Sequence, residues 1–148
     1  MSGIICAVRG GPDSQSTIEK AINLANEVNL PLYFLYIVNL DFLSHTQSSK
    51  TSTITEQLVQ MGEFILLAAQ EKASTQNVEA QAIIHKGDVR EEIIATAREL
   101  QAEYIILGQP VGDHENNEFL LERLREFEKN LEQETGADVI LAGGPPQE

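Results

Sequence analysis

The chain has 148 residues, of which 42% are hydrophobic, so residues 1–148 are expected to form a single domain with a buried core. Its formal net charge of −13 argues against nucleic acid and anionic membranes as partners, because an acidic surface repels phosphate and gains nothing from counterion release. Every apolar run falls far short of the roughly 18 residues that a membrane-spanning helix needs.

The first part of the chain predicts a strand, a helix and a second strand. Gly3 to Val8 is an apolar run that ends at an Arg-Gly-Gly-Pro turn. A helix is expected from Ser16 to about Asn29, because Ser16 and Glu19 have capping-box spacing and apolar residues follow at helical intervals. Leu32 to Val38 is apolar throughout, which predicts a central strand buried on both faces.

The middle of the chain begins with its one long polar stretch. Asp41 to Thr53 is rich in serine and threonine and has no apolar period, so we expect a long loop there. Apolar residues at helical spacing then predict a helix from Ile54 to about Ala73. Val78 to His85 alternates in its first half, which is typical of a strand near the edge of a sheet.

The next stretch predicts a helix and a buried strand between two glycine turns. Asp88 and Glu91 have the spacing of a capping box, so a helix is expected to begin just after Asp88 and to run to Leu100. Residues 101–103 are expected only to turn the chain. Tyr104 to Leu107 is apolar at consecutive positions, as in a strand covered on both faces.

The last part of the chain predicts a helix and a short strand. Asn116 or Asn117 is expected to cap the helix, and Gly136 is expected to end it. Val139 to Ala142 follows as the final strand. The chain thus alternates five strands with four helices, which indicates an α/β fold with a parallel sheet and helices on both faces.

The segments IICAVRGGPDS and HKGDVREEIIATARELQAEYIILG, together with the apolar second strand, resemble the universal stress protein family over nearly the whole chain. The resemblance implies a Usp-like, adenine nucleotide alpha hydrolase-like fold with strand order 3-2-1-4-5. It also implies that the protein forms homodimers through the fifth strand. It does not dictate the activity, because one fold supports many functions.

Members of this family that bind ATP carry a nucleotide motif, from which this chain departs. They have an acidic residue after the first strand, where this chain has Arg9. They continue with G-x-x-G, about nine residues, and glycine followed by serine or threonine, an arrangement that aims backbone N–H groups at the phosphates. Here the first pair is Gly108 and Gly112, one residue too far apart, and Glu122 stands at the position of the later glycine. Acidic residues fill the rest of the region: Asp113, Glu115 and Glu118.

Two hypotheses follow. The first is a non-enzymatic stress-response regulator that acts as a dimeric interaction module with an unknown protein partner, without cofactor and without ATP binding of the family type. The alternative is a protein that binds an adenine nucleotide, ATP or AMP, at the carboxyl end of the sheet, with at most slow hydrolysis. The candidate nucleotide-binding residues are Ala7, Val8, Arg9, Gly10, Val38, Leu107, Gly108, Gln109 and Gly112. Arg9 is open to two interpretations, contact with an anionic ligand or an ion pair with a nearby acid.

No catalytic or metal-binding residues are predicted. Ser44, Ser48 and Ser49 lie near His45 without an ordered acid partner, so a hydrolase triad has little support. The other two histidines, His85 and His114, share no ligand spacing with His45.

The final strand is the predicted dimer interface, formed by Val139, Ile140, Leu141 and Ala142. It is apolar at every position, yet the expected strand order places it at an edge, where open backbone groups favour pairing. The economical solution is to pair with the same strand of a second copy about a two-fold axis. The alternative is that the Gly-Gly-Pro-Pro tail folds back over the edge.

Cys6 lies inside the first apolar run, which favours a buried and inert thiol. One cysteine cannot form an internal disulfide, and the first residues lack the basic region of a signal peptide. Both features predict a cytoplasmic protein.

Overall fold

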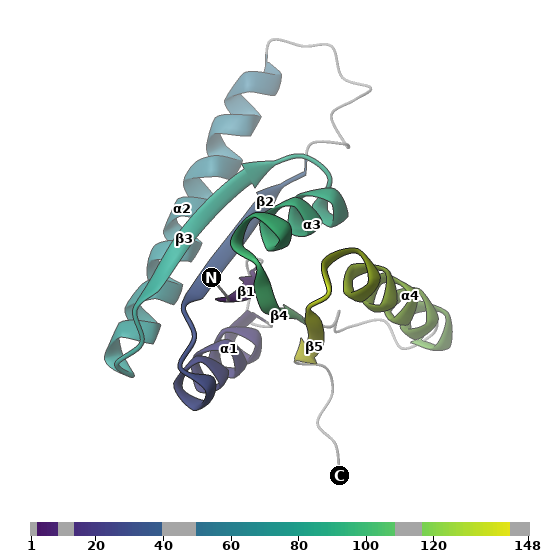
Figure 1. Cartoon of the computed structure of the whole chain (residues 1–148). Coiled ribbons are helices and arrows are strands. Elements are labelled where there is room, and N and C mark those ends of the chain that lie inside the picture. The colour runs from purple at the N-terminus through teal and green to yellow at the C-terminus, as the bar shows by residue number, and fades with distance from the viewer. Residues whose placement is uncertain (1–2, 9–13, 40–49, 109–116, 143–148) are drawn as a thin grey trace.

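The computed structural model describes residues 3–8, 14–39, 50–108 and 117–142. Strands and helices alternate along these ranges (Figure 1). The strands are β1 Gly3–Ala7, β2 Leu32–Val38, β3 Ala80–Lys86, β4 Ala102–Gly108 and β5 Asp138–Ala142. The helices are α1 Ser14–Val28, α2 Lys50–Thr75, α3 Val89–Leu100 and α4 Asn117–Thr135.

All five strands are parallel and lie in the order β3-β2-β1-β4-β5, which confirms the predicted topology. β1 is the central strand, and its Cys6 is in register with Phe34 of β2 and Ile106 of β4. Because the strands are parallel, the carboxyl ends of β1, β2 and β4 lie side by side at one end of the sheet.

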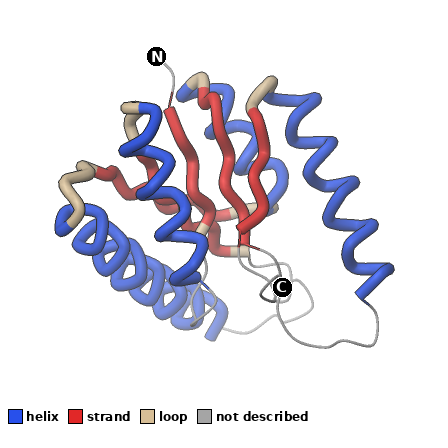
Figure 2. The backbone as a smooth tube through the Cα atoms, turned by 90° about the horizontal axis from the view of Figure 1, so that it is seen from below, coloured by secondary structure: helices blue, strands red, loops and turns tan. Residues whose placement is uncertain are grey.

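Helices cover both faces of the sheet (Figures 1 and 2). Alternate residues of β1 separate the two cores: Ile4 and Cys6 pack with α1 and α2, whereas Ile5 packs with α3 and α4. All three side chains are fully buried. The apolar runs of the central strands therefore reflect burial from two sides, as the sequence predicted.

Two helices begin earlier than predicted. α1 begins at Ser14, so the prediction that Ser16 and Glu19 form its capping box was wrong. α2 begins at Lys50, so the end of the predicted 41–53 loop is helical, and the rest of that loop lies outside the described residues. Both starts are polar in sequence, and polar residues give no apolar period from which a helix start could be read.

The turn between α3 and β4 is shorter than predicted. Gln101 adopts the left-handed conformation, with φ +53°, and reverses the chain by itself, so β4 begins at Ala102 and not at Tyr104. Other strand ends differ from the prediction by one or two residues, because an apolar run does not fix the residue at which strand pairing stops. Gly136, with φ +76°, follows the end of α4 as predicted.

None of the helices in the described ranges is long and apolar enough to cross a membrane. The outer face of α2 exposes Met61, Phe64 and Leu67, each by more than half of its surface.

Candidate functional site

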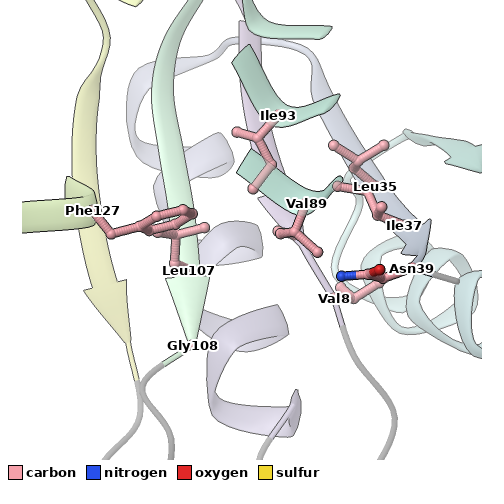
Figure 3. Close-up of a pocket in the computed structure, with 10 residues that line it drawn as sticks. Val8, Leu35, Ile37, Asn39, Val89, Ile93, Leu107, Gly108 and Phe127 are labelled. Atoms are coloured by element: carbon pink, nitrogen blue, oxygen red, sulfur yellow. The ribbon is translucent and has the colours of Figure 1, made fainter. Parts of the chain in front are cut away.

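A pocket of about 380 Å³ lies at the carboxyl end of the sheet, on the face that α3 and α4 cover (Figure 3). Strands β1, β2 and β4 supply one side of it, α3 and α4 the other. The lining residues are Ala7, Val8, Leu35, Ile37, Asn39, Val89, Ile93, Leu107, Gly108 and Phe127. Its volume falls within the range of about 300–1,000 Å³ that is typical of small-molecule sites.

The pocket exists because strand and helix periodicity place apolar side chains on one side. Leu35 and Ile37 are two residues apart on β2 and therefore point to the same face. Val89 and Ile93 are four residues apart on α3, which puts them on the same side of the helix. Phe127 reaches the pocket from α4, on the side of Leu107, as Figure 3 shows.

Two contacts in the β3–α3 turn fix the start of α3 beside the pocket. The Asp88 carboxylate accepts a hydrogen bond of 3.0 Å from the backbone N–H of Glu91, which confirms the predicted cap. Gly87 has φ +146°, and a Cβ there would lie 2.8 Å from the Glu92 carboxylate, so only glycine fits. Val89 therefore begins the helix at the edge of the pocket.

A histidine–carboxylate pair ties β3 to α3 next to this turn. His85 Nδ1 lies 3.0 Å from Glu92 Oε1 and 3.3 Å from the hydroxyl of the buried Thr96. His85 is in register with Ile37, which lines the pocket. The pair thus holds α3 against the strand that neighbours the pocket.

The lining is almost entirely apolar. Within the described residues, Asn39 is its only polar side chain, and Figure 3 shows the amide directed from the end of β2 toward the interior. An amide offers both donors and acceptors, so it suits a ligand edge that presents both. No charged side chain belongs to the described lining. The arrangement therefore favours a flat, mostly apolar group with a polar edge.

The structure brings together four of the predicted nucleotide-binding residues: Ala7, Val8, Leu107 and Gly108 all line the pocket. Val38 does not line it, since its buried side chain packs in the core on the opposite face. Alternation along β2 explains this, because residues 35 and 37 take the pocket side. The other candidates, Arg9, Gly10, Gln109 and Gly112, lie outside the described residues, as do His45, His114 and Ser44.

Sequence reasoning missed six lining residues: Leu35, Ile37, Asn39, Val89, Ile93 and Phe127. The strand residues had a detectable signal, because a strand buried on both faces must present alternate side chains to each side. Phe127 had no sequence signal specific to a binding site. It belongs to the apolar stripe of the last helix, and only the tertiary packing directs it to the pocket.

Cys6 is buried, as predicted, and burial raises the pKa of its thiol. Its Sγ lies 3.8 Å from the carbonyl oxygen of Thr17. In the part of the chain that the structure describes, no group of three or more histidine, cysteine or acidic residues is arranged to hold a metal ion.

The predicted interface strand β5 is an edge strand of the sheet. Val139 and Ala142 are each 6% exposed, whereas Ile140 and Leu141 are only partly buried. The backbone N–H of Val139 donates to Glu132 Oε2 of α4 at 3.2 Å. At this edge the apolar side chains of Ile140 and Leu141 are partly uncovered, while the backbone N–H of Val139 is already hydrogen-bonded to the Glu132 side chain.

The fold and the pocket define a class: an α/β protein with a five-stranded parallel sheet and a ligand-sized pocket at the point where the strand order reverses. The sequence model described as the universal stress protein family matches residues 1–122. The chain belongs to that family.

Solved structures of this family have the same fold. UspA from Lactobacillus plantarum is 16% identical, with a TM-score of 0.75 over 95% of this chain and 97% of that one. A family protein from Burkholderia pseudomallei is 22% identical, with a TM-score of 0.68 over 95% and 94%. One from Arabidopsis thaliana, solved with AMP bound, is 14% identical, with a TM-score of 0.62 over 99% and 93%. A search of curated proteins gave no significant match.

Proposed function

We propose that the pocket binds the adenine end of a small nucleotide and that the protein is a nucleotide-responsive regulator without hydrolytic activity. The observation that carries the proposal is the pocket itself, a ligand-sized apolar space at the end of β1, β2 and β4 with Asn39 directed into it. Adenine has an apolar face and an edge with both a donor and an acceptor, and asparagine pairs with that edge. A similar fold from Arabidopsis thaliana was solved with AMP bound.

A nucleotide with one phosphate fits this chain better than Mg-ATP. The segment after β4 has a lengthened glycine pair and contributes Asp113, Glu115 and Glu118 to the sequence. The later glycine position is occupied by Glu122, which is exposed on α4. Each added phosphate increases the repulsion from these carboxylates. We therefore expect affinity to fall from AMP to ATP.

Calorimetric titration with adenosine, AMP and Mg-ATP tests this order. We expect saturable binding of adenosine and AMP and a weaker signal for Mg-ATP. A ligand present at a hundred times its Kd also raises the stability by ~2.7 kcal/mol, which thermal unfolding detects. Absence of any saturable signal with all three ligands would overturn the proposal, and tighter binding of Mg-ATP than of AMP would overturn the order.

Two phenylalanines provide matched variants for locating the site. Phe127 lines the pocket, whereas Phe64 is 72% exposed on α2 at the other face of the sheet. Phe127→Ala is expected to weaken AMP binding by at least about tenfold, ~1.4 kcal/mol, because an aromatic wall is lost. Phe64→Ala should leave the affinity unchanged. Equal effects of the two variants would place the site elsewhere.

The edge strand supports a second part of the proposal, that two copies pair through β5. Ile140 and Leu141 are apolar and partly uncovered at an edge, and a two-fold axis lets the same strand cover both copies. Ile140→Asp is expected to convert a dimer to a monomer in analytical ultracentrifugation. Leu67→Asp, which adds the same charge at an exposed position on α2, is the control. A mass unaffected by Ile140→Asp would contradict this interface.

A further inference from the structure

Glu132 occupies a backbone donor at the open edge of β5. Its Oε2 accepts a hydrogen bond of 3.2 Å from the N–H of Val139. In a parallel sheet, the backbone groups of successive residues point alternately to one neighbouring strand and to the other. Since Val139 donates to a side chain beyond the strand, Val139 and Leu141 direct their backbone groups away from β4. Among the described residues, none bonds the outward N–H of Leu141.

These two outward residues determine how a second β5 strand can pair. In an antiparallel ladder, the residues of a hydrogen-bonded pair exchange both N–H···O bonds, so both must face the partner. The register that overlaps all of Asp138–Ala142 has its two-fold axis at Ile140 and sets Val139 opposite Leu141 of the second copy. Half of the bonds in that ladder then use the N–H of Val139 as donor, and Glu132 already holds this donor in each copy.

The position of Glu132 on α4 explains why its carboxylate turns to the strand. It lies in the last part of Asn117–Thr135, where the helix carboxyl terminus carries partial negative charge and disfavours a carboxylate. The last turn contains no basic residue to offset it. The nearby Glu134 is paired with Arg98 at 2.8 Å. The Val139 N–H gives Glu132 its compensating hydrogen bond.

We propose that Glu132 is a gate on self-association: its carboxylate competes with the second copy for the Val139 N–H, and the dimer forms fully only when this contact is released. The proposal rests on the β5 dimer proposed above. The partner is a second copy of this chain, whereas the competing hydrogen bond lies within one chain. The gate therefore weakens strand pairing but leaves the proposed apolar contact between the Ile140 side chains of the two copies unchanged.

Sedimentation of Glu132→Ala against Glu126→Ala tests the gate. Both variants remove one carboxylate from α4, but Glu126 is exposed and takes no part in the described contacts. Glu132→Ala is expected to lower the dimer dissociation constant by at least about tenfold, ~1.4 kcal/mol, relative to Glu126→Ala. If Ile140→Asp makes the protein monomeric but Glu132→Ala and Glu126→Ala have equal dimer dissociation constants, the gate is overturned and the dimer proposal still holds. A monomer in every variant would overturn both.

Amide hydrogen exchange gives a second measurement if Glu132→Ala lowers stability. In dilute Ile140→Asp protein, the Val139 amide is expected to exchange more slowly than the Leu141 amide, because only Val139 is bonded to Glu132. Adding Glu132→Ala to that background should remove the difference. Fast exchange at Val139 while Glu132 is present would show that the carboxylate does not hold the donor, and the gate would be wrong.

Discussion

The two faces of the sheet are packed differently at the carboxyl ends of the strands. On the face covered by α1 and α2, Val38 and Ala142 are 2% and 6% exposed and belong to one continuous core. On the other face, the core under α3 and α4 ends at the pocket of about 380 Å³. One sheet therefore has a face that is closed to its end and a face that is left open there.

This difference indicates which face of the sheet mainly determines folding stability and which face mainly determines ligand binding. A side chain in a closed core contributes its full hydrophobic and dispersion energy to folding stability. A side chain that borders a pocket contributes less, because part of its surface has no packing partner. Substitutions on the closed face should therefore alter folding alone. Substitutions on the open face should alter folding less and ligand binding more.

The largest effect is expected from Phe34→Ala in β2. Phe34 is fully buried on the closed face, and its removal leaves an enclosed cavity. We expect the free energy of unfolding to fall by ~3–5 kcal/mol, measured by urea titration at an unchanged m-value. A loss of less than about 1 kcal/mol would mean that the closed core relaxes into the space, and the comparison would fail.

A matched isoleucine pair sharpens the comparison. Ile22 of α1 and Ile93 of α3 are both fully buried helix residues, but only Ile93 borders the pocket. Either change to alanine is expected to cost ~2–5 kcal/mol, with Ile22→Ala the more costly by ~1 kcal/mol, since its cavity is fully enclosed. The order should hold in urea titrations of both variants. Only Ile93→Ala should also change AMP affinity.

A smaller effect is expected at the cap of α3. Asp88→Ala removes the acceptor for the Glu91 N–H and should cost ~1 kcal/mol. Asp88→Asn keeps an acceptor and is expected to be nearly neutral. Thermal unfolding of the two variants checks the order, and equal midpoints would show that the cap contributes nothing.

The smallest effects are expected from the exposed ion pairs, one on each face. Lys72 lies 2.9 Å from Glu19 on the α1 and α2 side, and Arg98 lies 2.8 Å from Glu134 on the other. Either change to alanine should cost ~0–1 kcal/mol, less at high salt. The two costs are expected to be similar, because each cation makes one further hydrogen bond: Lys72 donates to Gln15 Oε1 at 2.8 Å, and Arg98 Nε donates to the Glu134 carbonyl oxygen at 2.9 Å. Urea titration at low and high salt measures both.

The strands and their order could be predicted from the sequence because short, contiguous segments of the chain carry the signals for them. Runs such as Leu32–Val38 are apolar throughout, and glycine turns and Asp88 mark where the chain changes direction. The predicted boundaries were wrong where tertiary packing or the conformation of a single residue determines where an element begins. Gln101 turns the chain in the left-handed region, which is unusual for glutamine and has no sequence signal.

The site could be predicted only in part, for a physical reason. Parallel strands bring their carboxyl ends together, so Val8, Leu107 and Gly108 followed from topology alone. Phe127 meets strands that are distant in sequence, and Glu132 meets the strand that follows its own helix. The local sequence pattern of a helix does not show how the helix is oriented relative to the sheet. The same limit hid the contact at Val139, which makes the predicted dimer edge less open than its apolar residues indicated.

The burial of Cys6 gives this chain an internal reporter of its own opening. It is the only cysteine, it lies in the central strand, and its side chain is 0% exposed. An alkylating reagent should reach the thiol only when β1 separates from its neighbours, so the alkylation rate relative to that of the unfolded chain measures the free energy of that opening. No label or substitution is needed. The same assay, run with and without AMP, would report pocket occupancy as slower alkylation.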